Sequence, residues 1–476
     1  MASLIEPPPA TAIAAGALED APQPRWYQGI DRYAWTVLLI AALGWMFDTF
    51  DQHLFNLVRQ ASVTELLQKS MPSADAATIA AEAGRVGPNL TSVFLLGWAT
   101  GGFLFGTLGD KLGRTRTMSI TIFIYALFTG LNGLVQTMPQ YYVCRFLVAL
   151  GVGGEFAAGA ALVAEVWPQR SRAMGLGLLQ SLSAVGNIAA ALTTLILSAV
   201  SWRYVFMVGA LPALLIVWIR RSVHEPDAWH QAKAKAAEEG TSSEFGSIPA
   251  LFRRPEIRRN TFAGILLATA GVGGLWGVGF FSVDLIGQVF PPLIKGAPNI
   301  AAINDPRAQE AAVKAALQQW KSVLFLVQMI GAGLGMFSFA ALSERIGRRP
   351  ALGLFFVLAF ASVQAFFQGM HGPLSAFLLI FPLGFCTLAP LSAFSIYFPE
   401  LFPTRLRATG VGFCYNAARI FAAGAPFTLG KLSEVFATGD KAAGLRAAAS
   451  IVACIYFVGF IGLALAPETR GQALPE

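Results

Sequence analysis

Five ionisable residues stand inside long apolar stretches of this sequence: Asp48, Asp51, Arg145, Glu155 and Arg419. A charge in apolar surroundings is costly unless it is paired or hydrated, so such residues are candidate functional groups. Asp48 and Asp51 are three residues apart and would share one face of a helix. An arginine favours the ionised form of a nearby carboxylate, and desolvation favours the protonated form. A carboxylate–arginine pair that can separate could therefore load and release a proton.

Arg419 lies about ten residues into its apolar stretch and requires an anion. That anion is either a protein carboxylate or a substrate carboxylate held by two parallel hydrogen bonds, and we favour the substrate. Glu155 is either a second protonation site or a carboxylate bonded to a neighbouring helix. Asp48 could also line a water-filled cavity. Further polar groups could complete a binding site, although each could equally be an interhelical hydrogen bond: Asn187, Gln328, Tyr415 and Asn416. Trp276 could form a cavity wall, although core packing would also explain it.

The composition is that of a protein that crosses a membrane many times. Apolar residues make up 55% of the 476 residues and charged residues only 13%. The basic residues are scattered singly at the ends of apolar stretches, which fits control of topology and argues against nucleic acid as a partner. The four cysteines all lie inside apolar stretches, and no metal-ligand spacing is present, so neither a disulfide framework, a metal nor a cofactor is expected.

Apolar stretches of the length needed to cross a bilayer, roughly 20 residues, recur along the whole chain. We predict an all-α integral membrane protein with twelve transmembrane helices and long external loops near 59–88 and 287–319, the second ending in an amphipathic helix. The predicted spans are 34–58, 89–109, 117–136, 141–164, 174–198, 203–220, 262–286, 320–342, 351–371, 374–398, 409–430 and 446–466. The seventh is rich in glycine, which would let it bend or approach a neighbour closely.

The two halves of the sequence repeat one plan. Gly106-Thr-Leu-Gly-Asp-Lys-Leu-Gly-Arg114 is echoed at 340–348, with Asp110 corresponding to Glu344 at an offset of 234 residues. Glu165-Val-Trp-Pro-Gln-Arg-Ser-Arg172 is echoed by Glu400-Leu-Phe-Pro-Thr-Arg-Leu-Arg407 at an offset of 235. Two motifs with nearly one spacing predict two six-helix bundles related by a parallel pseudo-repeat.

The distribution of basic residues predicts the orientation. With the amino terminus in the cytoplasm, 21 of the 34 Lys and Arg residues fall on the cytoplasmic side and 11 on the opposite side. Both termini are therefore expected in the cytoplasm. The predicted organisation is a disordered tail over 1–30 that lacks the features of a signal peptide, bundles over 31–220 and 261–467, a cytoplasmic linker over 221–260 and a tail over 468–476.

The repeated charged turns between spans two and three and between spans eight and nine resemble the signature loop of the major facilitator superfamily. Arg145 with Gly151-Val-Gly-Gly-Glu155 and the closing Pro467-Glu-Thr-Arg-Gly471 resemble two further motifs of that superfamily. Within it, Phe47-Asp-Thr-Phe-Asp51, Glu165-Val-Trp-Pro168 and Glu225-Pro-Asp-Ala-Trp229 look most like bacterial sialate:proton and metabolite:proton symporters, which are related to sugar porters.

The resemblance implies roles for particular residues. It implies a pair between Asp51 and Arg145, with the aspartate accepting the transported proton. It also implies a cytoplasmic charge network that locks the outward-open state and breaks as the halves rock. The alternative is that these charges only set the topology. The network members are Asp110, Arg114, Glu165, Arg170 and Arg172, mirrored by Glu344, Arg348, Glu400, Arg405 and Arg407.

The resulting hypothesis is a monomeric secondary transporter of the cell inner membrane that takes up a small organic anion with protons. The anion would be a carboxylate, an acidic sugar or an aromatic acid. A neutral sugar or polyol symporter is the main alternative, and a nutrient sensor that does not transport is an alternative of another class. Proton-driven efflux is disfavoured because 175–199 contains no proline, whereas antiporters of this superfamily carry a Gly-Pro pair there. An enzyme is not expected, because the four histidines are scattered over different segments.

Overall fold

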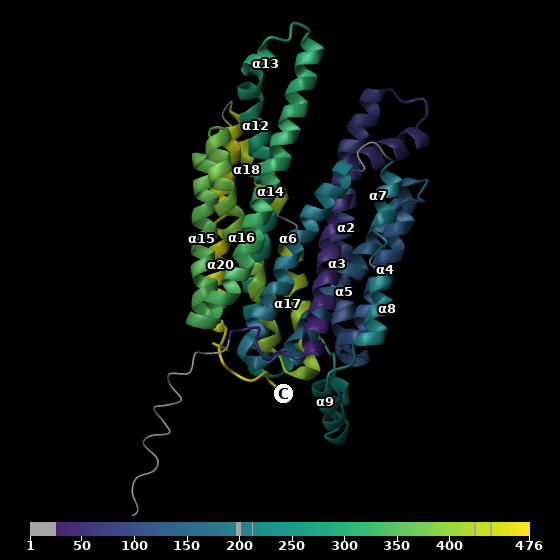
Figure 1. Ribbon diagram of the computed structural model, residues 1–476, viewed down its shortest axis with the longest axis vertical. Coiled ribbons are helices and arrows are strands. Elements are labelled where there is room, and N and C mark those ends of the chain that lie inside the picture. The colour runs from purple at the N-terminus through teal and green to yellow at the C-terminus, as the bar shows by residue number, and fades with distance from the viewer. Residues whose placement is uncertain (1–24, 197–200, 212, 423–424, 438–439) are drawn as a thin grey trace, which may run out of the picture.

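The protein is described by a computed structural model over residues 25–196, 201–211, 213–422, 425–437 and 440–476 (Figure 1). These residues form helices and connecting turns, with no strand among them. Most of the predicted amino-terminal tail lies outside the described residues. The carboxyl terminus and helix α9 (Asp227–Glu238) lie at the lower end of the molecule as drawn.

The first half of the chain forms a series of long helices joined by short turns. Gly113 provides one of these turns with φ of 109°, a conformation that favours glycine. The helices are α2 (Arg32–Ser70), α3 (Ala76–Leu112), α4 (Arg114–Asn132), α5 (Met138–Val166), α6 (Arg172–Ile196), α7 (Trp202–Val208) and α8 (Ala213–Ser222), with the 3₁₀ turn η1 (Gln169–Ser171) before α6.

The second half follows a connecting segment that contains α9, η2 (Ser242–Glu244) and α10 (Ala250–Arg253). Gly347, the counterpart of Gly113, has φ of 101° and separates two helices in the same way. The helices are α11 (Pro255–Gly277), α12 (Ser282–Lys295), α13 (Pro298–Ala301), α14 (Pro306–Ile346), α15 (Arg348–Gly369), α16 (Pro373–Leu401), α17 (Arg407–Ala422), α18 (Ala425–Phe436), α19 (Lys441–Val452) and α20 (Ile455–Leu465), with η3 (Gly279–Phe281) before α12 and η4 (Thr404–Leu406) before α17.

The two segments predicted to be external loops are mainly helical in the structure. The segment 59–88 is almost entirely helical, because α2 continues to Ser70 and α3 begins at Ala76. Buried Val63, Leu66 and Leu67 explain this, since they give the end of α2 an apolar face that packs in its own cluster. The segment 287–319 is also mainly helical, and the predicted amphipathic helix is the continuous start of α14. The glycine-rich seventh span breaks at Val278, after α11.

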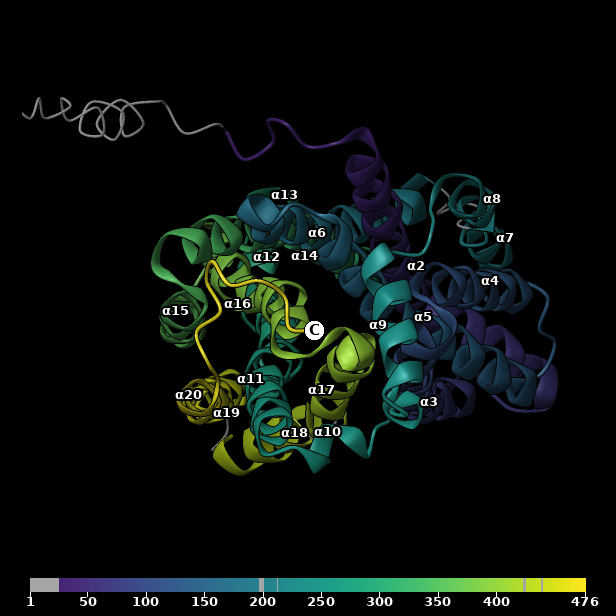
Figure 2. The same ribbon diagram turned by 90° about the horizontal axis from the view of Figure 1, so that it is seen from below.

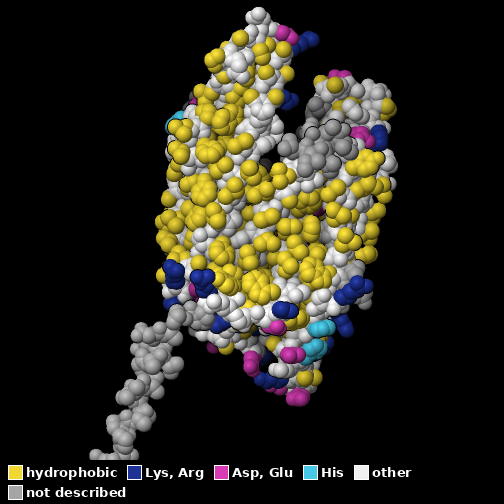
Figure 3. Space-filling model, viewed as in Figure 1, with side chains coloured by type: hydrophobic (Ala, Val, Ile, Leu, Met, Phe, Trp, Pro, Cys, Tyr) yellow, Lys and Arg dark blue, Asp and Glu magenta, His cyan; other side chains and the backbone are white. Residues whose placement is uncertain are grey.

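Nine helical segments in the described part of the chain are long and apolar enough to cross a membrane. The three remaining predicted spans coincide with α4 and with the pairs α7–α8 and α17–α18, which are shorter or more polar. Hydrophobic side chains cover the middle of the visible face, while Lys, Arg, Asp and Glu gather at its two ends (Figure 3). The chain is thus an all-helical, multi-pass membrane protein.

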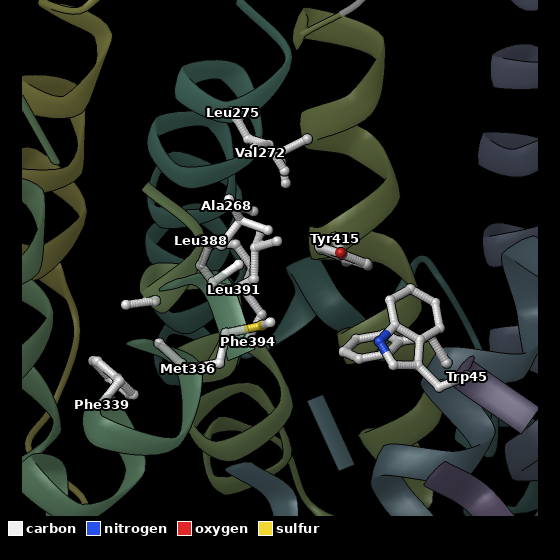
Figure 4. Close-up of a cluster of buried hydrophobic side chains, with 14 of the residues drawn as sticks. Trp45, Ala268, Val272, Leu275, Met336, Phe339, Leu388, Leu391, Phe394 and Tyr415 are labelled. Carbon is white, nitrogen blue, oxygen red and sulfur yellow. The ribbon is translucent and has the colours of Figure 1, made fainter. Parts of the chain in front are cut away.

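Contacts between the two halves are concentrated in two seams, α3 against α17 and α6 against α14. Viewed from below, these seams lie on different sides of the molecule (Figure 2). Glycine allows the close approach in the first seam, where a Cβ on Gly412 would stand 2.6 Å from the Gly102 carbonyl oxygen. Between the seams, buried side chains of the second half, among them Leu391 and Phe394, extend toward Tyr415 and Trp45 (Figure 4).

Candidate functional site

Asp51 and Arg145 meet inside the first half of the chain. Arg145 Nη1 of α5 lies 3.5 Å from Asp51 Oδ2 of α2, and both side chains are at most 1% exposed. Thr129 of α4 donates a 2.8 Å hydrogen bond to Asp51 Oδ1. The Arg145 guanidinium also stacks 3.9 Å from the ring centre of Phe55, while its Nε and Nη2 atoms have no hydrogen-bond partner among the described residues. The pair is therefore in contact but incompletely satisfied, as a pair that can separate would be.

Asp48 and Glu155 form a second buried group one turn away. Both side chains are 1% exposed. Neither carboxylate oxygen of Asp48 has a hydrogen-bond partner among the described residues, and the same holds for Glu155 Oε2. Burying unpaired carboxylates is costly, so this group is a candidate for protonation.

Arg419 of α17 lies at the α3–α17 seam, in contact with both halves. Its guanidinium stands between the rings of Trp98 and Tyr415, at 3.9 Å from each centre. Its Nη1 donates a 2.5 Å hydrogen bond to Asn416 Oδ1. Tyr415 continues into an aromatic wall with Phe156, whose ring centre is 4.7 Å away. No ion pair joins Arg419 to a carboxylate within the described ranges, so its charge is met by aromatic faces and an amide.

The other predicted site residues have contacts of their own. Asn187 contacts Met329 at the α6–α14 seam, with 3.4 Å between the amide nitrogen and the sulfur. Gln328 is buried and donates to the Gly279 carbonyl oxygen at 3.3 Å, within the second half. Trp276 lies at the end of α11 and packs against the main hydrophobic core. Of the predicted partners, Tyr415 and Asn416 contact Arg419. Sequence reasoning missed Thr129, Trp98 and Phe156, because each lies on a different helix from the residue that it contacts.

The predicted charge network centres on Glu165 at the lower end of the molecule. Glu165 Oε1 accepts from Arg114 Nη2 at 3.0 Å and from Arg407 Nη1 at 2.6 Å, and all three side chains are at most 1% exposed. Arg114 also pairs with Asp110 at 3.1 Å and donates to the Thr404 carbonyl oxygen at 2.7 Å. Glu165 thus joins an arginine of the first half to an arginine of the second.

Asp110 makes a second connection between the halves. Its carboxylate accepts from the backbone N–H groups of Ala408 and Thr409, at 3.1 and 2.8 Å, and from the Thr409 hydroxyl at 2.6 Å. These donors form the start of α17, where the helix dipole favours a negative charge. The carboxylate at the end of α3 therefore caps a helix of the other half.

The mirrored members of the network are arranged differently. Arg348 pairs with Glu400 at 3.0 Å and with Glu344 at 3.6 Å, all within the second half. Arg172, the counterpart of Arg407, is buried near Glu400 and Glu344 but makes no ion pair with them, although all three lie in the described part of the chain. Instead, Thr469 donates a 2.5 Å hydrogen bond to Glu400.

Two predicted members lie outside this arrangement. Arg170 binds the Gln28 carbonyl oxygen in the amino-terminal segment. Arg405 faces Glu244 of the connecting segment, with 3.7 Å between Nε and Oε2. Neither contacts the acidic members at 165 and 400, because each side chain points toward a terminal or connecting segment that the repeat does not contain.

Two glutamates that follow the last helix of each half were missed as structural elements of the site. Glu225 accepts from the backbone N–H groups of Arg114 and Arg116, at 2.7 and 3.1 Å, and Glu468 accepts from those of Arg348 and Arg349, at 2.8 and 3.0 Å. Each thereby caps the helix that follows a left-handed glycine. A sequence signal for these two glutamates was available, because each stands next to a proline after the last helix of its half, in Glu225-Pro and in Pro-Glu468.

We expect Glu468→Gln to lower thermal stability in a pH-dependent way. Partial burial opposes ionisation of Glu468, but the N–H groups of Arg348 and Arg349 outweigh it and hold its pKa below the ordinary 4.5. A carboxylate whose pKa is lower in the folded state than in the unfolded state stabilises the fold at pH values above its unfolded-state pKa. This stabilisation is lost as the pH falls through the folded-state pKa. The melting-temperature difference between wild type and variant should be constant above about pH 5.5 and shrink below about pH 4.5. A difference that grew on acidification would contradict this.

We expect Gly102→Ala to disable the Arg419 site. A Cβ on Gly102 would overlap the Asn416 amide that holds Arg419, and α3 and α17 would have to separate. Small residues at tightly packed helix seams tolerate little added volume. Uptake should fall more than about tenfold, since one misplaced hydrogen-bonded charge costs about 1.5–3 kcal/mol. Gly430→Ala, with no atom within 4 Å of the added Cβ, is the control and should transport normally at equal expression.

Comparison with known proteins decides the family. A family model described as Major Facilitator Superfamily matches residues 29–294 of this chain. The chain belongs to this superfamily. It is therefore a secondary transporter of small molecules, embedded in a membrane, and not an enzyme. The resemblance stated from the repeated turns is confirmed at this level.

Bacterial metabolite transporters are among the similar proteins. A probable 4-methylmuconolactone transporter of Cupriavidus pinatubonensis is 30% identical, over 90% of each chain. The sialic acid transporter NanX of Escherichia coli is 27% identical over 87% of this chain and 91% of the relative. The cis,cis-muconate transport protein of Acinetobacter baylyi is 29% identical over 74% and 79%.

The fold is similar to that of a solved superfamily member, the proton:xylose symporter XylE. The two structures align with a TM-score of 0.68 over 93% of this chain and 98% of the other, at 15% identity. At that identity the likeness concerns the fold.

Proposed function

We propose that this transporter takes up a small organic anion together with protons across the bacterial inner membrane. The observation that carries the proposal is Arg419, a buried guanidinium at the seam between the halves without a carboxylate partner among the described residues. A substrate carboxylate could supply that partner through two parallel hydrogen bonds. The Arg419 environment is aromatic, which suits a planar or conjugated acid. The similar proteins that handle muconate and sialic acid support an acidic substrate.

The proposed coupling site is the Asp51–Arg145 pair. When the pair is closed, the arginine stabilises the aspartate anion, and when substrate-driven helix movement separates them, burial favours the protonated aspartate. Thr129 can remain bonded to either form, because a hydroxyl donates to a carboxylate and accepts from a carboxylic acid. The pair would thus take up a proton at one stage of the cycle and release it at another.

The proposed architecture has twelve transmembrane helices in two bundles, over 31–220 and 261–467, related by a parallel pseudo-repeat and functioning as a monomer. We assign the lower end in Figure 1 to the cytoplasm, with both termini, the linker over 221–260 and the charge network there. At that end Glu165 and Asp110 tie the halves together, whereas the upper ends of the two lobes stand apart in Figure 3. The arrangement fits a carrier closed toward the cytoplasm, with the network as the lock for that state.

The test is uptake into proteoliposomes with and without an imposed proton gradient. The panel contains cis,cis-muconate, 4-methylmuconolactone, nicotinate, N-acetylneuraminate and a neutral hexose. We expect gradient-driven accumulation of an acid. Accumulation of the hexose alone would favour the sugar symporter, and binding without any flux would favour the sensor.

We expect Asp51→Asn to separate transport from coupling. The variant should lose accumulation driven by the proton gradient, because the residue can no longer change protonation state. Exchange of labelled for unlabelled acid should persist, because substrate binding and helix movement remain. Retained gradient-driven accumulation would contradict the role of Asp51, and loss of both activities with a normal elution profile would indicate a structural ion pair.

A further inference from the structure

The two carboxyl groups of Asp48 and Glu155 occupy one site between α2 and α5. The Glu155 carboxyl fills the space that Gly44 leaves on α2, since a Cβ there would overlap it. Gly44 precedes Asp48 by four residues and therefore lies on the same face of α2. This places the Glu155 carboxyl beside that of Asp48.

A single proton would satisfy this pair. Two ionised carboxylates are acceptors only, and here both oxygens of Asp48 and Oε2 of Glu155 are buried without a donor among the described residues. A proton on either group turns it into a donor to the other and removes the repulsion between two buried charges. Such a pair titrates as a unit rather than as two separate residues.

The two arginines near Asp48 and Glu155 differ in whether they already have a carboxylate partner. Arg145 is engaged by Asp51, at 3.5 Å. Arg419 has no such ion pair in the described ranges, and it lies close to the pair: its ring partner Tyr415 packs at 4.7 Å on Phe156, the residue that follows Glu155. The titratable or charged groups that act on Asp48 are Asp51 on α2, Tyr125 on α4, Glu155 on α5 and Arg419 on α17. Among these groups, Arg419 is therefore the cation left to balance an ionised Asp48.

Building on the proposed function, we propose that Asp48 and Glu155 bind one proton between them, and that protonation of this pair strengthens binding of the substrate carboxylate to Arg419. When the pair is fully ionised, Asp48 competes with the substrate for Arg419 and repels its negative charge. When the pair holds its proton, that competition weakens. Proton binding and anion binding then favour each other by the same factor, which is the linkage that symport requires. This proton site is separate from Asp51.

The shared proton is tested first, by infrared difference spectroscopy of the purified full-length protein. We expect a protonated-carboxyl band that is present at about pH 5 and is lost as the pH is raised to about 9, which covers the pKa of about 8–9 documented for buried carboxyl groups. The Asp48→Asn/Glu155→Gln double variant should lose the band, and Glu310→Gln, at an exposed carboxylate, should keep it. A band that persists in the double variant, or its absence from wild type throughout this range, would overturn the shared proton.

The link to Arg419 is tested by calorimetric titration with nicotinate and cis,cis-muconate across the same pH range. Wild-type affinity should fall by about tenfold per pH unit above the titration of the pair, as release of one linked proton requires. The double variant has no ionisable carboxyl at either position, so its affinity should lose the pH dependence that the titration of the pair gives to wild type. Size-exclusion profiles and melting temperatures report whether each variant is folded.

The possible outcomes separate this inference from the proposed function. A double variant that keeps the wild-type pH slope would overturn the link to Arg419 while leaving acid transport intact. Failure of both acids to bind wild type at any pH would overturn the proposed function and the link together. The infrared result would still decide whether Asp48 and Glu155 share a proton.

Discussion

Arg419→Ala should abolish accumulation of the transported acid. The guanidinium is the buried cation at the seam that is available to a substrate carboxylate, and it is held by Trp98, Tyr415 and Asn416. Loss of a bidentate, charge-assisted interaction costs about 3 kcal/mol or more, which corresponds to at least about a 100-fold loss of affinity. Initial uptake rates at matched protein amounts measure this directly.

Arg419→Lys separates the charge from the geometry. Lysine keeps the positive charge but lacks the planar fork and the favourable stacking between two rings. Its uptake should lie between those of wild type and the alanine variant, with a higher KM and a smaller change in kcat. If the alanine variant transports the acid with wild-type kinetics, then Arg419 is structural and the substrate carboxylate binds elsewhere.

Glu165→Gln should open the lower end of the molecule. The substitution preserves shape but leaves Arg114 and Arg407, from opposite halves, facing each other without their shared anion. Removing one member of a buried ion pair costs about 3–5 kcal/mol. A loss of that size would shift the equilibrium between closed and open states by more than about 100-fold. Transport should slow, because the state that is closed at this end would seldom form.

A cysteine at position 395 can report the opening. The Ser395 hydroxyl of α16 is buried and donates to the Leu176 carbonyl oxygen of α6, in the other half, at 3.2 Å. With the four native cysteines replaced, Ser395→Cys should react with a membrane-impermeant maleimide much faster in the Glu165→Gln background. Glu400→Gln is the matched control, because its partners Arg348 and Thr469 lie in the same half. It should lower the melting temperature without exposing position 395. Equal labelling in both backgrounds would mean that the charges only set topology.

Composition predicted the all-helical membrane class, and the resemblance of the repeated turns to a known signature loop predicted the family. The repeat offset also paired Arg114 with Arg348 and Glu165 with Glu400 correctly as local groups, because each pair sits at the same place in its half. The offset could not show that the corresponding arginines of the two halves make different ion pairs where the halves meet. Arg407 reaches Glu165 across the seam, but Arg172 makes no equivalent ion pair with Glu400.

The Asp51–Arg145 contact was implied by family resemblance and is present at 3.5 Å. Its supporting residue Thr129 could not be found from the sequence, because threonine is common in apolar helices and its partner is 78 positions away. Of the residues that contact Arg419, the sequence predicted only Tyr415 and Asn416, which lie on α17 with it. Trp98 joins it through the packing of α3 on α17, which depends on glycine contacts that no single-helix pattern reveals. Asn187 and Gln328 were grouped with Arg419 by residue type alone.

Helix α14 has 41 residues and so extends about 60 Å, roughly twice the thickness of a bilayer core. Its first turns, together with α12 and α13, form the tall upper projection in Figure 1. A small carrier confined to its micelle offers few features for aligning particle images. Here, a rigid reporter domain inserted between Ala301 and Pro306, or an antibody fragment raised against that tip, would be tied to the second half without touching the seams. Such a marker would let electron cryo-microscopy follow the tilt of one half against the other during transport.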